Sequence, residues 1–140
     1  MNYKFYGNEN CNIKDARGLT PRDYYDILDN IWCENTCAPH MRKDWSAANK
    51  TLGQCSITAF LMQDLYGGKV FGMILPDGIR HCFNVVGDVV FDLTSEQFQG
   101  KKLDYSAAVE QSREEHFLRT EKKDRYLYLK EKLEEAVAKR

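Results

Sequence analysis

Three residues of the sequence carry side chains that together could perform nucleophilic catalysis: Cys55, His81 and Asp92. A thiol becomes a strong nucleophile only when it ionises, and a helix N-terminus or a neighbouring imidazole lowers its pKa. A carboxylate can then hold that imidazole in a fixed orientation. The spacing allows a Cys-His-Asp triad. It equally allows a structural His–Asp pair beside an inert buried cysteine.

The thiol of Cys55 is predicted to lie at the start of an apolar helix. Residues 56–66 place Ile57, Phe60, Leu61 and Leu65 on one face, and Gly67-Gly68 follows as a stop signal. An earlier helix is expected to begin at Pro21, because Thr20 can cap it, and its apolar repeat runs to Ile31. Both helices precede the residues that would supply the imidazole and the carboxylate.

Three strands are expected after the second helix, over residues 69–75, 79–86 and 89–93. Gly87-Asp88 suits a two-residue hairpin turn, and in that register Phe83 faces Asp92. His81 then shares a face with Asp92 at a diagonal Cα separation of roughly 7–8 Å, within reach of a side-chain hydrogen bond.

The face that carries His81 and Asp92 is otherwise apolar, and we expect the Cys55 helix to cover it. In the same register Cys82 and Asn84 point to the opposite face, so neither is expected to be a direct partner of His81. A His and an Asp on an apolar face should be paired, since isolated buried polar groups are costly.

The remainder of the chain is expected to be helical. Residues 94–97 resemble a capping box that opens a short helical turn, and an amphipathic helix is expected beyond Ala107. We expect its apolar stripe to dock on the sheet, with a partner-binding or self-associating helix as the alternative, and His116 to be solvated. The prediction is a single α+β domain over 1–140, with a core at about 20–98 and a C-terminal helical segment at about 105–140.

Composition excludes several classes of function. The 140 residues include 20 Lys+Arg and 21 Asp+Glu, which argues against binding to nucleic acid or to an anionic membrane. No run approaches the ~20 apolar residues of a membrane helix. Five cysteines without a signal-type N-terminus favour a cytoplasmic, reduced protein.

A metal site is the competing use of the cysteines. Cys33, Cys37 and His40 have C-x3-C-x2-H spacing, and Cys55, His81 and Cys82 add further soft ligands. A structural zinc site, however, normally shows two tight paired motifs. Only one loose half is present, so we predict neither a metal nor a cofactor.

Several motifs resemble the YunG-like family of uncharacterised bacterial proteins. They are Thr51-Leu-Gly-Gln-Cys-Ser-Ile-Thr-Ala59, His81-x-Phe-Asn84 and Phe91-Asp-Leu-Thr94 with Glu96-Gln-Phe98. Trp45 and the Arg125-Tyr126 and Leu129 pattern are similar too, so the resemblance covers roughly residues 20–135. This chain departs by carrying Cys82-Phe83 where the family has Tyr-Trp.

The order Cys, His, Asp on a helix and two adjacent strands is also similar to the papain-like superfamily, in particular its transglutaminase-like and NlpC/P60-like branches. The resemblance implies a papain-like core in which Cys55 is the nucleophile, His81 the general base and then acid, and Asp92 the orienting residue. Gln54 or the backbone N–H of Cys55 would serve the oxyanion, and Trp45 would line the substrate groove.

The implied activity is attack on an amide or other acyl group of a peptide or small amide substrate. Peptidase, amidase, deamidase and acyltransferase share this first step, so all four stay open. The alternative is a non-catalytic papain-like binding module.

Overall fold

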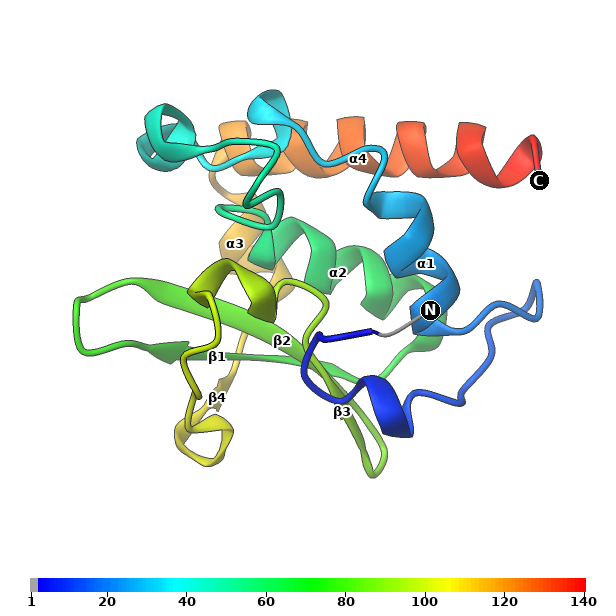
Figure 1. Ribbon diagram of the computed structural model, residues 1–140, viewed down its shortest axis with the longest axis horizontal. Coiled ribbons are helices and arrows are strands. Elements are labelled where there is room, and N and C mark those ends of the chain that lie inside the picture. The colour runs from blue at the N-terminus through cyan, green and yellow to red at the C-terminus, as the bar shows by residue number, and fades with distance from the viewer. Residues whose placement is uncertain (1–2) are drawn as a thin grey trace.

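Residues 3–140, which the computed structural model describes, form helices stacked on a four-stranded antiparallel sheet (Figure 1). The strands are β1 (Lys69–Ile74), β2 (Arg80–Val86), β3 (Val89–Phe91) and β4 (Val109–Glu110), in the order β3-β2-β1-β4. The predicted α+β class is confirmed. The sequence did not predict β4, which has two residues and pairs with β1 at Gly72 and Phe71.

The α-helices form two layers above the sheet. They are α1 (Pro21–Leu28), α2 (Cys55–Tyr66), α3 (Arg113–Phe117) and α4 (Thr120–Ala138). Figure 1 shows α2 between the sheet and α4. Short 3₁₀ helices connect these elements: η1 (Asn8–Asn10), η2 (Glu34–Thr36), η3 (Pro39–Asp44), η4 (Ser95–Phe98) and η5 (Tyr105–Ala107).

The first helix begins where the sequence predicts. The Thr20 hydroxyl accepts a hydrogen bond from the Asp23 N–H, and the Asp23 carboxylate accepts one from the Thr20 N–H. The helix ends at Leu28, however, and the predicted extension to Ile31 is wrong. The chain closes with tighter turns there, because the N–H groups of Asn30 and Ile31 bond three residues back.

Helix α2 is the centre of the core. Every residue from Ser56 to Met62 is buried, since the helix packs on β2 and β1 on one side and on α4 on the other. A helix that is apolar nearly all round is stable only in such a position.

The register of the β2–β3 hairpin is as predicted. Val86 pairs with Val89 and Asn84 pairs with Phe91, around a turn in which Gly87 has a φ of +59°. Strand β3 ends at Phe91, earlier than expected, because Asp92 no longer pairs with β2. The Asp92 N–H instead donates to the Tyr6 carbonyl of the N-terminal segment at 3.0 Å.

The prediction that the Cys55 helix covers the sheet face of His81 and Asp92 is wrong. Helix α2 lies on the face of Cys82 and Asn84, where the Asn84 side-chain amide donates to the Ala59 carbonyl at 2.8 Å. Phe83 points the other way, onto Phe71 and Tyr105. Burying an amide beneath α2 is tolerated because it satisfies a helix carbonyl.

The C-terminal segment also differs from the prediction. It forms α3 and α4, and α4 buries Tyr126, Leu129 and Leu133 against α2 rather than against the sheet. Leu127 and Tyr128 lie on its outer, solvent-exposed side. Within the described residues, no helix has both the length and the apolar character needed to cross a membrane.

Candidate active site

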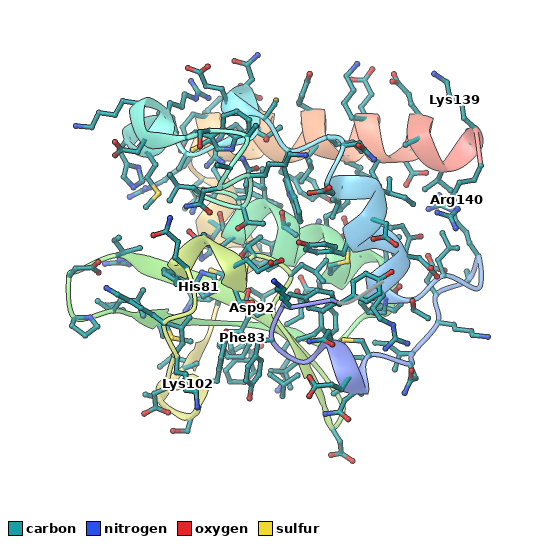
Figure 2. The ribbon with its side chains drawn as sticks, viewed as in Figure 1. His81, Phe83, Asp92, Lys102, Lys139 and Arg140 are labelled. Atoms are coloured by element: carbon teal, nitrogen blue, oxygen red, sulfur yellow. The ribbon has the colours of Figure 1, made fainter. Side chains whose placement is uncertain are left out.

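His81 and Asp92 form a buried ion pair where β2 and the end of β3 meet (Figure 2). His81 Nε2 lies 2.5 Å from Asp92 Oδ2, and each residue is 1% exposed. The diagonal pairing predicted from the hairpin register therefore brings these two side chains together.

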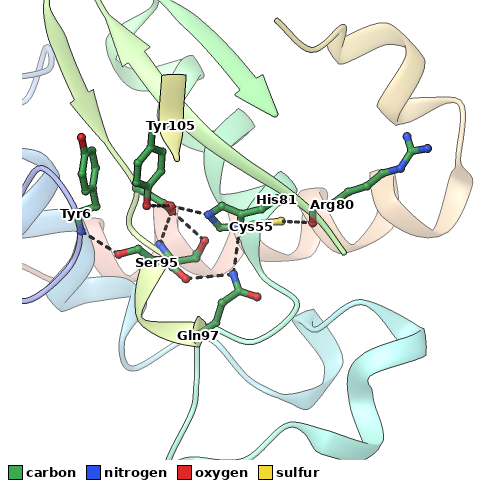
Figure 3. Close-up of polar contacts among 9 residues, drawn as sticks. Tyr6, Cys55, Arg80, His81, Ser95, Gln97 and Tyr105 are labelled. Carbon is green, nitrogen blue, oxygen red and sulfur yellow. Dashed lines mark hydrogen bonds and ion pairs between the residues drawn. The ribbon is translucent and has the colours of Figure 1, made fainter. Parts of the chain in front are cut away.

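Three further hydrogen bonds hold the Asp92 carboxylate. The Tyr105 hydroxyl donates to Oδ2 at 2.7 Å, and the Thr94 N–H and hydroxyl donate to Oδ1 at 3.2 and 3.3 Å (Figure 3). Thr94 was predicted to cap η4, but its hydroxyl bonds the carboxylate instead. The Asp92 side chain is thus fixed from both sides while it holds the imidazole.

The Asp92 carboxylate also decides the charge of His81. Burial opposes the protonated imidazole, but the attraction of Asp92, with a further contribution from Cys55, outweighs it and raises the pKa of His81 to about 10. Because Asp92 occupies Nε2, Nδ1 is the nitrogen that remains to exchange a proton with a thiol. Phe98 of η4 packs edge-on against the imidazole at 4.7 Å between ring centroids.

Cys55 is the first residue of α2, and its sulfur lies against the open edge of β2. Since β3 pairs only with residues 84–86, the preceding part of β2 has a free edge on that side. The Arg80 carbonyl on this edge lies 3.9 Å from Cys55 Sγ (Figure 3). The helix N-terminus and the beginning of β2 thus position the thiol next to His81.

The environment of Cys55 favours its thiolate. The neighbouring Cys82 thiol is the largest cause, and together with the imidazole and charge of His81 and the Cys82 backbone it outweighs burial. The pKa of Cys55 is lowered well below its usual value. The pKa of the Cys82 thiol is raised, because it lies beside Cys55 and is buried.

Gln54 and Trp45 do not take the oxyanion and groove positions that the resemblance implies. The Gln54 side chain is fully buried behind Cys55, where its Nε2 donates to the Cys33 carbonyl at 3.1 Å and its Oε1 has no partner within residues 3–140. The Trp45 indole N–H donates to the Lys50 carbonyl at 3.0 Å. Neither is among the residues that line the cavity at Cys55.

That cavity has a volume of about 110 Å³ and lies between the start of α2, β2 and the C-terminal helices. Cys55, Cys82 and Gln97 are among the residues that line it. Its charged and imidazole side chains are His40, Arg80, His116, Arg119, Glu121, Lys122 and Arg125.

Sequence reasoning missed four contributors to this site. Tyr105 comes from a segment with no periodic pattern, and His116 was predicted to be solvated but is half-buried at the cavity. Cys82 was assigned to the face opposite His81 and was not expected to be its direct partner. Gln97, whose amide nitrogen lies 3.4 Å from His81 Nδ1, stood in the Glu96-Gln-Phe98 pattern without a role.

The cysteines outside this site show no metal arrangement. Within residues 3–140, no three His, Cys, Asp or Glu side chains gather so as to hold a metal ion. Cys37 is buried and Cys33 is half-buried, and both are free thiols.

Comparison with known proteins identifies the family. The YunG protein family model matches residues 20–138. The uncharacterized protein YunG of Bacillus subtilis (strain 168) is 38% identical over 105 residues, which cover 75% of this chain and 84% of that protein. No solved structure matches the chain. The chain therefore belongs to the YunG protein family.

Proposed function

We propose that this protein is a cysteine-dependent hydrolase or acyltransferase that acts on amide-type acyl groups through Cys55, His81 and Asp92. The buried pairing of His81 Nε2 with Asp92 at 2.5 Å carries the proposal. It leaves Nδ1 for a thiol whose pKa is lowered, at the N-terminus of a helix and at the wall of a cavity.

In the proposed reaction the Cys55 thiolate attacks the acyl carbon, and the carbonyl π electrons move to oxygen. The first N–H groups of α2, which have no partner within the helix, can donate to this oxyanion. When the tetrahedral intermediate collapses, the C–N bond breaks and the His81 imidazolium gives its Nδ1 proton to the leaving amine. Water or another acceptor then attacks the thioester, with His81 as the base, and releases Cys55.

A papain-like core is part of this proposal. The supporting features are a cysteine that opens a buried helix, and a histidine and a carboxylate on the antiparallel hairpin beside it. Asp92 would orient the imidazole and stabilise its charge, as a carboxylate does in a nucleophile–histidine–carboxylate triad.

The test is cysteine-resolved alkylation. Short pulses of iodoacetamide over a series of pH values, followed by mass spectrometry, give a rate for each cysteine. We expect Cys55 to react at about pH 6, where an ordinary thiol is almost entirely protonated. The half-buried Cys33 serves as the internal reference.

A histidine variant and a control outside the cavity make this test specific. His81→Gln keeps a polar group beside Asp92 and should move the reactivity of Cys55 to higher pH. The control is Lys123→Gln, because Lys123 is exposed on α4 and is not among the residues that line the cavity. A Cys55 that reacts no faster than Cys33 at about pH 6, or whose profile is the same in His81→Gln, contradicts the proposal. A binding module would then be the better interpretation.

A further inference from the structure

The cavity beside Cys55 is strongly cationic. Four of its side chains are basic, Arg80, Arg119, Lys122 and Arg125, and one is acidic, Glu121. The carboxylate of Glu121 pairs with the Arg125 guanidinium at 2.9 Å, and Arg125 also donates to the Thr36 carbonyl. The acidic group of the cavity and one of its basic groups therefore satisfy each other.

The other three cations have no carboxylate partner. Within residues 3–140, Arg80, Arg119 and Lys122 take part in none of the ion pairs of the structure. The chain as a whole has a formal charge of -1, so this local excess of positive charge is not a general property of its surface.

Lys122 is the most constrained of the three. It is half-buried on α4, and its ammonium donates to His116 Nδ1 at 2.8 Å. His116 is itself fixed, since its Nε2–H donates to Gln111 Oε1 at 3.0 Å and its ring packs edge-on against Phe60 at 5.0 Å. An ammonium has three N–H donors, and an imidazole satisfies one of them.

The protonation of this pair agrees with the geometry. Burial and the nearby Lys122 lower the pKa of His116 to about 4, so the imidazole is a neutral acceptor at physiological pH. Burial is the largest cause that lowers the pKa of Lys122, and the nearby Cys82 and Cys55 thiols offset it only in part. Within residues 3–140 no carboxylate pairs with this ammonium, so a carboxylate that enters the cavity can accept charge-assisted hydrogen bonds from it.

We propose that Lys122, positioned by His116 and assisted by Arg119 and Arg80, binds a carboxylate of the substrate close to the carbon that Cys55 attacks. This inference rests on the proposed function and adds the class of substrate: an acyl compound that carries a negative charge near the scissile bond. The cavity volume of about 110 Å³ is small against the roughly 300–1,000 Å³ of pockets for drug-sized ligands, so it fits a short acidic group.

A pair of alkylating reagents tests the inference without a known substrate. Iodoacetate and iodoacetamide differ by a carboxylate in place of a neutral amide. In both reactions the Cys55 thiolate forms an S–C bond to the methylene carbon and iodide leaves. The measured quantity is the ratio of the two rate constants at Cys55, iodoacetate over iodoacetamide. The reference is the same cysteine in the urea-unfolded chain, which has no cavity.

We expect the ratio at Cys55 to be higher in the folded protein than in the unfolded chain. In Lys122→Gln it should fall by about fivefold, the effect of one partly screened charge pair. The matched control is Lys123→Gln, which removes the same charge from an exposed neighbour outside the cavity. High salt should weaken the preference as well.

The outcomes separate the two proposals. If Cys55 reacts rapidly with iodoacetamide but shows no folded-state preference for iodoacetate, or keeps its preference in Lys122→Gln, the carboxylate inference is wrong and the proposed function stands. If Cys55 reacts slowly with both reagents at about pH 6, the activated thiolate is absent and both proposals fall.

Discussion

Tyr105 offers the sharpest test of how the Asp92 carboxylate is held. Its hydroxyl donates to the same oxygen, Oδ2, that accepts from His81, at 2.7 Å. Tyr105→Phe removes this donor and keeps the ring, which packs on Phe83 and stacks on Tyr6. The variant therefore changes one charge-assisted hydrogen bond and very little packing.

The size of the effect follows from burial. Asp92 is 1% exposed, so bulk water does not replace the lost donor. Hydrogen bonds to charged groups contribute about 1.5–3 kcal/mol. We expect the free energy of unfolding to fall by about 2 kcal/mol. With an m-value of about 2 kcal/mol/M, the urea midpoint then moves down by about 1 M.

Tyr6→Phe is the matched control, because it deletes the same group from the ring stacked on Tyr105. Tyr6 is 46% exposed, and the change should stay within about 0.5 kcal/mol. The assay is urea unfolding followed by circular dichroism at pH 7. The reasoning is refuted if Tyr105→Phe loses no more stability than Tyr6→Phe at an unchanged m-value.

Three further perturbations test other parts of the account. Cys82→Ala removes a buried thiol that favours the Cys55 thiolate, so the alkylation profile of Cys55 should move to higher pH; an unmoved profile contradicts this role. Gly53→Ala should destabilise the protein by more than the roughly 1–2 kcal/mol of left-handed backbone strain, because its Cβ would lie 2.5 Å from Cys37 Sγ. Gly87→Ala is the control, because its Cβ would meet nothing within 4 Å. Equal losses of stability in urea unfolding would refute this. In Cys55→Ala the Asp92 carboxylate still raises the folded pKa of His81 above its unfolded value, so its contribution is complete below about pH 6.5 and is lost as pH rises through the raised folded pKa. Urea unfolding of Cys55→Ala should therefore show falling stability between about pH 7 and 8.5, before unfolded thiols titrate, and the slope should vanish when His81→Gln is added.

The parts of the fold that the sequence predicts are those with local causes. Thr20 and Asp23 fix the start of α1 within four residues, and the Gly87-Asp88 turn fixes the register that joins His81 to Asp92. Because successive side chains of a strand point to opposite faces of the sheet, this register also predicts which residues share a face with His81.

The parts that it does not predict depend on contacts between distant segments. Which face of β2 meets α2 is decided by Cys82 and Asn84, and a buried amide such as Asn84 gives no apolar signal. Tyr105 reaches Asp92 from a polar stretch without periodicity. His116 is drawn into the site by Lys122 and Gln111, although its local sequence is that of a solvated helix.

The central claim is that folding gives Cys55 an ionised thiol at neutral and mildly acidic pH. The direct measurement is the ultraviolet absorbance of thiolate in a pH titration of the wild type, from which the titration of Cys55→Ala is subtracted. The account predicts a difference of one thiolate that is already present at about pH 6. A difference that appears only at about pH 8.5, where an ordinary thiol ionises, would contradict it.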